Sequence, residues 1–68
     1  MITETGTCQS YDGTVEGAYL VEDDMLVTVF QWDDTNNEWR SKTTQIGGLT
    51  SEIVAKRLIS EELNEFWS

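Results

Sequence analysis

A single cysteine, Cys8, is the feature that most limits how this chain can fold. A chain of 68 residues buries only about 60% of the surface that its unfolded form exposes, so domains of this size often rely on disulfides, metals or a second subunit. One cysteine cannot form a disulfide within the chain, and there is no histidine to complete a zinc site. The sequence therefore predicts one small domain over residues 1–68 that gains stability as a homodimer.

The chain is strongly acidic, with 13 Asp and Glu residues against four Lys and Arg and a formal net charge of −9. Affinity for nucleic acid or for anionic lipid comes largely from cations that meet phosphates, so direct binding to either is disfavoured. No apolar run has the length of a signal peptide or of a membrane span, which predicts a cytoplasmic protein. A hydrophobic content of 38% with three Trp residues predicts a folded domain.

The pattern of the chain changes at Gly47 and Gly48, from β-like sequence to helical sequence. Residues typical of strands alternate with turns that contain Asp, Asn or Gly, and Thr50 can cap a following helix. We therefore predict an α+β fold, a four-stranded antiparallel β-meander with one C-terminal helix packed on one face (ββββα). The expected strands are Ile2 to Gln9, Thr14 to Glu22, Met25 to Trp32 and Glu38 to Ile46. The apolar side of the helix is expected to comprise Val54, Ala55, Leu58, Ile59, Leu63 and Phe66.

A two-residue turn at Asp23-Asp24 sets the expected register of the central hairpin, because strand register follows turn length. Gly17 then lies on the face that the helix covers, with Gly6 beside it, and leaves room for an aromatic ring or a close-packed helix. Trp32 is expected to meet Trp39 across the next hairpin, on the same covered face. The predicted pairs are Val21 with Leu26, Tyr19 with Thr28, Gly17 with Phe30 and Val15 with Trp32.

Groups suited to catalysis or metal binding are sparse. Without a histidine, Cys8 lacks its usual general base, and its expected position on the covered face predicts an inert thiol. Paired carboxylates in turns are usually solvated rather than held in a cleft. The segment from Asp33 to Glu38 is rich in oxygen but lacks the spacing and central Gly of a calcium-binding loop. We predict no enzyme activity, no catalytic or cofactor-binding residues, no metal site and no cofactor.

The second face of the sheet is expected to carry a contiguous apolar patch rimmed by charge, which is typical of an interface. The alternative is a half-polar solvent face diluted by threonines. The residues predicted to form the protein interface are Leu20, Met25, Val27, Val29, Arg40 and Lys42.

These observations favour a small, non-enzymatic, acidic binding protein that is a homodimer and that occupies another macromolecule through its acidic surface or its apolar sheet face. One specific form is an inhibitor that mimics DNA: spaced carboxylates imitate phosphates and block a nucleic-acid-binding protein, as small proteins of phages and mobile elements do. The alternative is a small-ligand or metal-binding accessory domain, which a pocket between helix and sheet would favour. Acidity also arises from selection for solubility, so charge alone does not decide.

Overall fold

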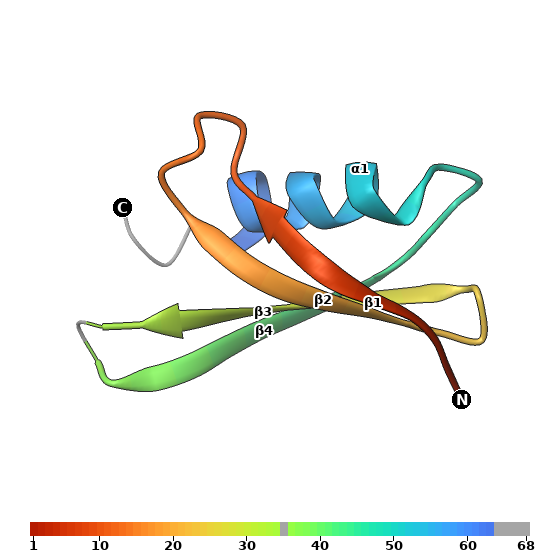
Figure 1. The fold of residues 1–68 in the computed structure, drawn as a ribbon, viewed down its shortest axis with the longest axis horizontal. Helices are drawn as coiled ribbons and strands as arrows, with labels where there is room; N and C mark the ends of the chain where they lie inside the picture. Colours follow the sequence, from red (N-terminus) through yellow and green to blue (C-terminus); the bar gives the residue numbers. More distant parts are fainter. Residues whose placement is uncertain (35, 64–68) are drawn as a thin grey trace.

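Four antiparallel strands form one open sheet with a helix across one face in the computed structural model, which describes residues 1–34 and 36–63 (Figure 1). The strands are β1 (Ile2–Gln9), β2 (Glu16–Glu22), β3 (Leu26–Asp33) and β4 (Glu38–Gln45), in the order β1-β2-β3-β4. α1 (Ser51–Arg57) continues into a π-helical segment, η1 (Leu58–Glu62). The predicted ββββα meander is confirmed. No helix in the described residues is long and apolar enough to span a membrane.

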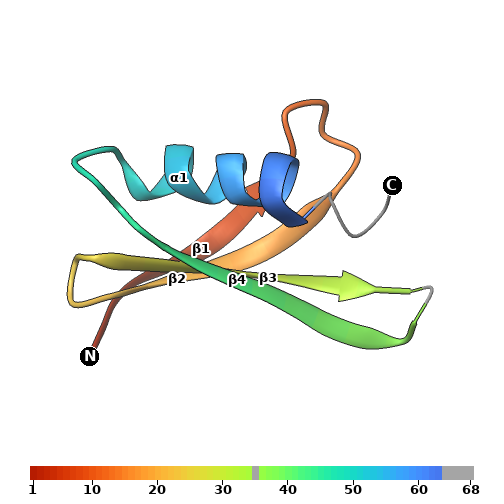
Figure 2. The ribbon, with the colours of Figure 1, turned by 180° about the vertical axis from the view of Figure 1, so that it is seen from behind.

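The helix begins where the sequence predicts it. Thr50 has an extended backbone, and its Oγ1 accepts a hydrogen bond from the Ile53 N–H at 3.3 Å, which satisfies one of the free amides of the first turn. The predicted apolar side packs on the sheet (Figure 2). Its buried members are Val54, Ala55, Leu58, Ile59 and Leu63. Phe66, expected on the same side, lies outside the described residues.

Two glycines let the helix and an aromatic ring lie close to the sheet. A Cβ atom at Gly17 would lie 2.8 Å from Cδ1 of Ile59, and one at Gly6 would lie 2.8 Å from the ring of Tyr19. Both distances are shorter than real Cβ contacts, so neither position accepts a side chain without movement of its neighbours. The prediction that these glycines leave room for a helix and for a ring is confirmed.

The loop between β1 and β2 folds against the end of the helix. The backbone N–H of Tyr11 donates to Oγ of Ser60 at 2.9 Å. Within the loop, Oδ1 of Asp12 accepts hydrogen bonds from the Ser10 hydroxyl at 2.7 Å and from the Thr14 amide and hydroxyl at 3.0 and 2.8 Å. These bonds favour the charged carboxylate, the Ser10 bond most, and lower the pKa of Asp12 to about 2.

The turn between β2 and β3 differs from the prediction by one residue. Asp23 and Asp24 both have positive φ, at 52° and 57°, and the Met25 N–H donates to the Glu22 carbonyl at 2.9 Å, as in the expected two-residue turn. The ladder, however, pairs Glu22 with Leu26 rather than with Met25. Met25 is therefore an extra residue between turn and strand, and it displaces the register by one.

This displacement moves every side chain of β3 to the opposite face. Val27 and Val29 are 0% exposed beneath the helix, where they pair with Val21 and Tyr19 of β2. The prediction that Phe30 and its alternate neighbours on β3 face the helix is therefore wrong, and small β-branched residues fill the central strand of the core instead. The core residues on the sheet are Cys8, Tyr19, Val21, Val27 and Val29.

Candidate functional site

The face of the sheet that points away from α1, here called the outer face, is not covered by any described element (Figures 1 and 2). Val27 and Val29 of β3 and their partners Val21 and Tyr19 of β2 are buried beneath the helix. Because strand side chains alternate between faces, the residues on either side of them in each strand point outward. The cross-strand pairs of the outer face include a hydroxyl pair, Thr28 with Thr43, whose Oγ1 atoms lie 2.8 Å apart. Its apolar members include Ala18, Leu20, Leu26, Phe30, Trp32 and Trp39.

Two tryptophans form the most exposed aromatic group of the outer face. Trp32 of β3 and Trp39 of β4 are direct cross-strand partners, as predicted, although on the opposite face from the one expected. Their ring centroids lie 5.3 Å apart with an interplanar angle of 69°, an edge-to-face arrangement that aromatic pairs prefer. The two residues remain 41% and 66% exposed. A pair of large indoles presented to solvent at a strand end is typical of a binding surface.

The basic side chains lie on one side of the molecule, whereas carboxylates lie on both, with Glu4, Asp33 and Glu52 on the side of the helix. Arg40 and Lys42 pair with Gln31 and Val29, so by alternation both side chains lie on the side of α1. The other cations of the chain, Lys56 and Arg57, lie on the helix itself. In the described part of the chain the outer face therefore carries no Lys or Arg. The carboxylates on it and in its flanking turns are Glu16, Glu22, Asp23, Asp24 and Asp34.

The predicted interface residues are only partly brought together. Leu20 lies on the outer face opposite Thr28, and Met25 is exposed in the adjoining turn. Val27 and Val29 are buried in the core, so the prediction that they are exposed is wrong; the extra residue Met25 is the physical reason.

Arg40 and Lys42 also lie away from the predicted patch, on the side of the helix. The residues that sequence reasoning missed are Phe30, Trp32 and Trp39, which it assigned to the covered face. The signal that could have found them is the pairing of Asp33 with Arg40, each of which directly follows a tryptophan. Because neighbouring strand residues point to opposite faces, an Asp33–Arg40 ion pair on one face places Trp32 and Trp39 on the other.

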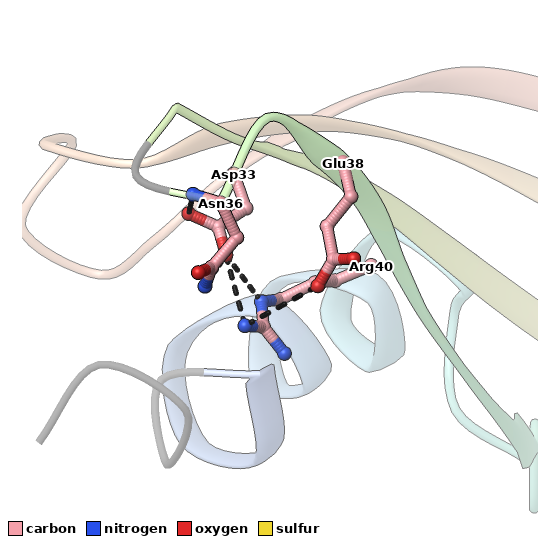
Figure 3. Close-up of polar contacts among 4 residues, drawn as sticks. All are labelled: Asp33, Asn36, Glu38 and Arg40. Carbon is pink, nitrogen blue, oxygen red and sulfur yellow. Dashed lines mark hydrogen bonds and ion pairs between the residues drawn. The ribbon is translucent and has the colours of Figure 1, made fainter.

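Beneath the tryptophan pair, on the helix side, an ion pair holds the end of the β3–β4 hairpin (Figure 3). Oδ2 of Asp33 accepts from Nε of Arg40 and lies near its terminal nitrogen, both at 2.9 Å, and it also accepts from the Asn36 side-chain amide at 2.8 Å. The Asn36 backbone N–H donates to the other carboxylate oxygen at 3.2 Å, and Glu38 lies 3.7 Å from Arg40. The buried carboxylate of the oxygen-rich turn is thus occupied by hydrogen bonds within the hairpin.

A second polar cluster ties the first two strands to the start of the helix. Glu4 Oε2 accepts from the Ser51 hydroxyl at 2.5 Å and from the Tyr19 hydroxyl at 2.8 Å. These two hydrogen bonds lower the pKa of Glu4, and the bond to Glu4 raises the pKa of Tyr19. Both shifts hold the groups in their ordinary charge states at neutral pH. The cluster therefore serves to fix the helix on the sheet rather than to move protons.

Two hollows flank the helix. The first, of about 480 Å³, is lined by Cys8 and Gly17 and by the polar residues Thr7, Gln9, Glu16, Glu52 and Lys56. The second, of about 470 Å³, lies between the helix and the end of β4, beside Ile46, Leu49 and Arg57. Ligand sites are predominantly apolar with a few convergent polar groups, and the first hollow has the reverse composition. Burial raises the pKa of the Cys8 thiol, which disfavours the reactive thiolate.

Metal ligands do not converge in the described residues, where no group of three or more His, Cys, Asp or Glu side chains could hold an ion. The outer face is consequently the arrangement with the clearest capacity for recognition, through aromatic and carboxylate groups. Comparison of the chain with protein-family models, with curated proteins and with solved structures found no match.

Proposed function

We propose that this protein is a non-enzymatic binding protein that docks its outer face on a basic surface of another protein. The observation that carries the proposal is the position of the basic side chains: every Lys and Arg of the chain lies on the side of the helix, and the outer face presents carboxylates and exposed aromatic rings. A cationic partner surface meets attraction on the outer face and no competing Lys or Arg there, and the Met1 amino group is already paired with Asp23 in the β2–β3 turn. Such complementarity steers association and suppresses wrong partners.

The apolar part of the outer face supplies the contact area that charge alone does not. Leu20, Phe30 and the tryptophan pair lie toward the middle and one end of the sheet, with Glu16 and Glu22 at the two ends of β2. Protein interfaces commonly have an apolar centre inside a polar rim, and Trp is enriched among the residues that dominate binding. The outer face has both parts.

A nucleic-acid-binding protein is the partner class that fits this chemistry best, because such proteins present clustered Lys and Arg to phosphates. In this form of the proposal the carboxylates of the outer face replace phosphates, and the protein acts as an inhibitor in the cytoplasm. Cys8, a free thiol, suits that reducing compartment. Complexes with a panel of purified basic DNA-binding domains should weaken with added salt and be competed by duplex DNA.

The position of the charge, rather than its amount, is what the proposal requires. Glu22→Lys and Asp34→Lys alter the outer face and its flanking turn, while Glu52→Lys alters the exposed side of α1 and changes the net charge equally. With a hexa-lysine peptide as the basic probe, each outer-face variant should lose about two- to five-fold in affinity, the range of an exposed charge pair. Glu52→Lys should bind like the parent. Equal losses in all variants, or no binding by the parent, would reject the proposal.

Self-association through the same face is a second candidate, favoured by the exposure of Trp32 and Trp39. Burial of apolar area in a homodimer yields about 25 cal/mol per Å² before association costs. Two outer faces without Lys or Arg repel each other, so a dimer of this kind should strengthen with salt. Sedimentation at low and high salt separates the candidates. A monomer at high micromolar concentration in both conditions removes the homodimer.

A further inference from the structure

We propose that the Trp32–Trp39 pair anchors arginine side chains of the partner, so that the outer face binds arginine-rich segments more tightly than lysine-rich segments of equal charge. This inference rests on the proposed function, because it assigns the chemistry of the partner at the same face. It adds a specific recognition element to an otherwise general attraction between opposite charges.

The indole face is the part of the pair that recognises a cation. Among aromatic side chains, Trp gives the strongest cation–π attraction, and Arg is its most frequent partner. The guanidinium group is planar, stacks on aromatic rings and is weakly hydrated, whereas the ammonium of Lys is compact and strongly hydrated. The rings of Trp32 and Trp39 meet edge to face at 69°, and Trp39 on the sheet edge is two-thirds exposed. Ring surface therefore remains available to a stacking guanidinium.

The protein's own cations do not reach this pair in the described structure. Arg40 is the nearest in sequence, but its guanidinium lies on the other side of the sheet against Asp33. Lys42 is also on the helix side, opposite Val29. The amino group of Met1 lies 3.1 Å from Asp23 of the β2–β3 turn, at the far end of the sheet from the tryptophans (Figure 1).

The hairpin that carries the pair is held together by a regular ladder and by an ion pair. The ladder of β3 and β4 runs without a register shift from Leu26 to Asp33. The ion pair of Asp33 and Arg40 joins the two strands at the residues that follow Trp32 and Trp39 in sequence (Figure 3). A preorganised site loses less entropy on binding. Asp34, which follows in the turn, supplies a carboxylate, the group that pairs with guanidinium in planar, bidentate geometry.

The test compares hexa-arginine with hexa-lysine, two probes of equal length and charge. Binding to the parent is measured by fluorescence anisotropy of labelled peptide, and the indole N–H signals of Trp32 and Trp39 are followed by NMR. Hexa-arginine should bind about two- to five-fold more tightly than hexa-lysine, the range expected for exposed cation–π contacts. The indole signals should shift with hexa-arginine.

Trp39→Leu keeps an apolar side chain but removes the π face, and it should abolish the preference for arginine, so that hexa-arginine and hexa-lysine bind this variant equally. Met25→Ala, an exposed apolar change at the opposite end of the sheet, is the matched control and should retain the preference. Equal binding of the two peptides by the parent, or a preference that survives in Trp39→Leu, would overturn the arginine anchor and leave the proposed function standing. Binding of neither peptide would overturn both. Indole signals that move with protein concentration alone would place a second copy on the pair and overturn the anchor.

Discussion

Arg40 directs two nitrogens at one oxygen of Asp33, with Nε and a terminal nitrogen each 2.9 Å from Oδ2. Asp33 is 0% exposed, and the two residues directly follow the paired tryptophans in sequence. Because neighbouring strand residues point to opposite faces, an ion pair on the helix side and an aromatic pair on the outer side share one hairpin end. The buried carboxylate thus supports the surface that we assign to binding.

Loss of Arg40 should destabilise the domain strongly. Arg40→Met leaves the Asp33 carboxylate buried without its counterion, and breaking a buried pair in this way costs about 3–5 kcal/mol. Urea unfolding followed by circular dichroism measures the free energy. Lys42→Met, an exposed change on the same strand, is the control and should stay within about 0.5 kcal/mol of the parent. A similar small change for Arg40→Met would contradict the structural role of the pair.

Adjacent residues on β3 should respond oppositely to a charge. Val27→Lys places an ammonium in the core and should unfold the protein, because an unpaired buried charge costs several kcal/mol. Leu26→Lys places the ammonium on the outer face, where the Leu26 side chain is already partly exposed, and this variant should keep the helical circular dichroism signal. The reverse outcome, with Val27→Lys folded and Leu26→Lys unfolded, would restore the two-residue register that the sequence predicts.

This register is the part of the fold that sequence could not decide. Both faces of β3 offer apolar side chains, Val27 and Val29 on one and Leu26, Phe30 and Trp32 on the other. Alternation alone therefore permits either choice, and the larger aromatic set was the natural core. The close approach of Ile59 to the sheet and the extra residue Met25 favour the smaller valines instead.

Strand order, the helix cap and the role of the glycines were predictable because each depends on local sequence. Thr50 caps α1 through its own side chain. Gly17 and Gly6 have no Cβ, so they allow a close approach to the sheet whichever residues they pair with. The candidate site was not predictable in the same way, since it depends on which face a whole strand presents. A one-residue difference exchanged the buried Val29 for the outward Phe30.

Acid should weaken the β1–β2 loop through Asp12, whose pKa of about 2 lies below the value of about 3.9 for an unfolded Asp. Between these values the unfolded chain binds more protons, so stability rises with pH. The contribution of Asp12 is complete above about pH 4 and is lost as pH falls through about 2. Thermal melts of the parent and of Asp12→Asn should differ by a constant amount above pH 4 and converge toward pH 2. A difference that does not vary with pH would contradict this linkage.

Folding should not require a metal ion. Thermal melts recorded with and without EDTA are expected to superimpose, because a bound ion stabilises the folded state by mass action and its removal lowers the midpoint. The oxygen-rich turn at Asp33 is checked separately by melts with added calcium and with chelator. These melts should also superimpose, because the Asp33 carboxylate is already hydrogen-bonded to Asn36 and Arg40. A fall of several degrees on chelation would show that a metal contributes.

The face that a basic partner touches is the most direct test of the account. Backbone amide signals assigned by NMR are followed while hexa-arginine is added. The largest shifts are predicted along β3 and β4, around Phe30, Trp32 and Trp39, with α1 between Ser51 and Arg57 unchanged. Shifts concentrated on α1, or in the hollow beside Cys8, would contradict the assignment of binding to the outer face.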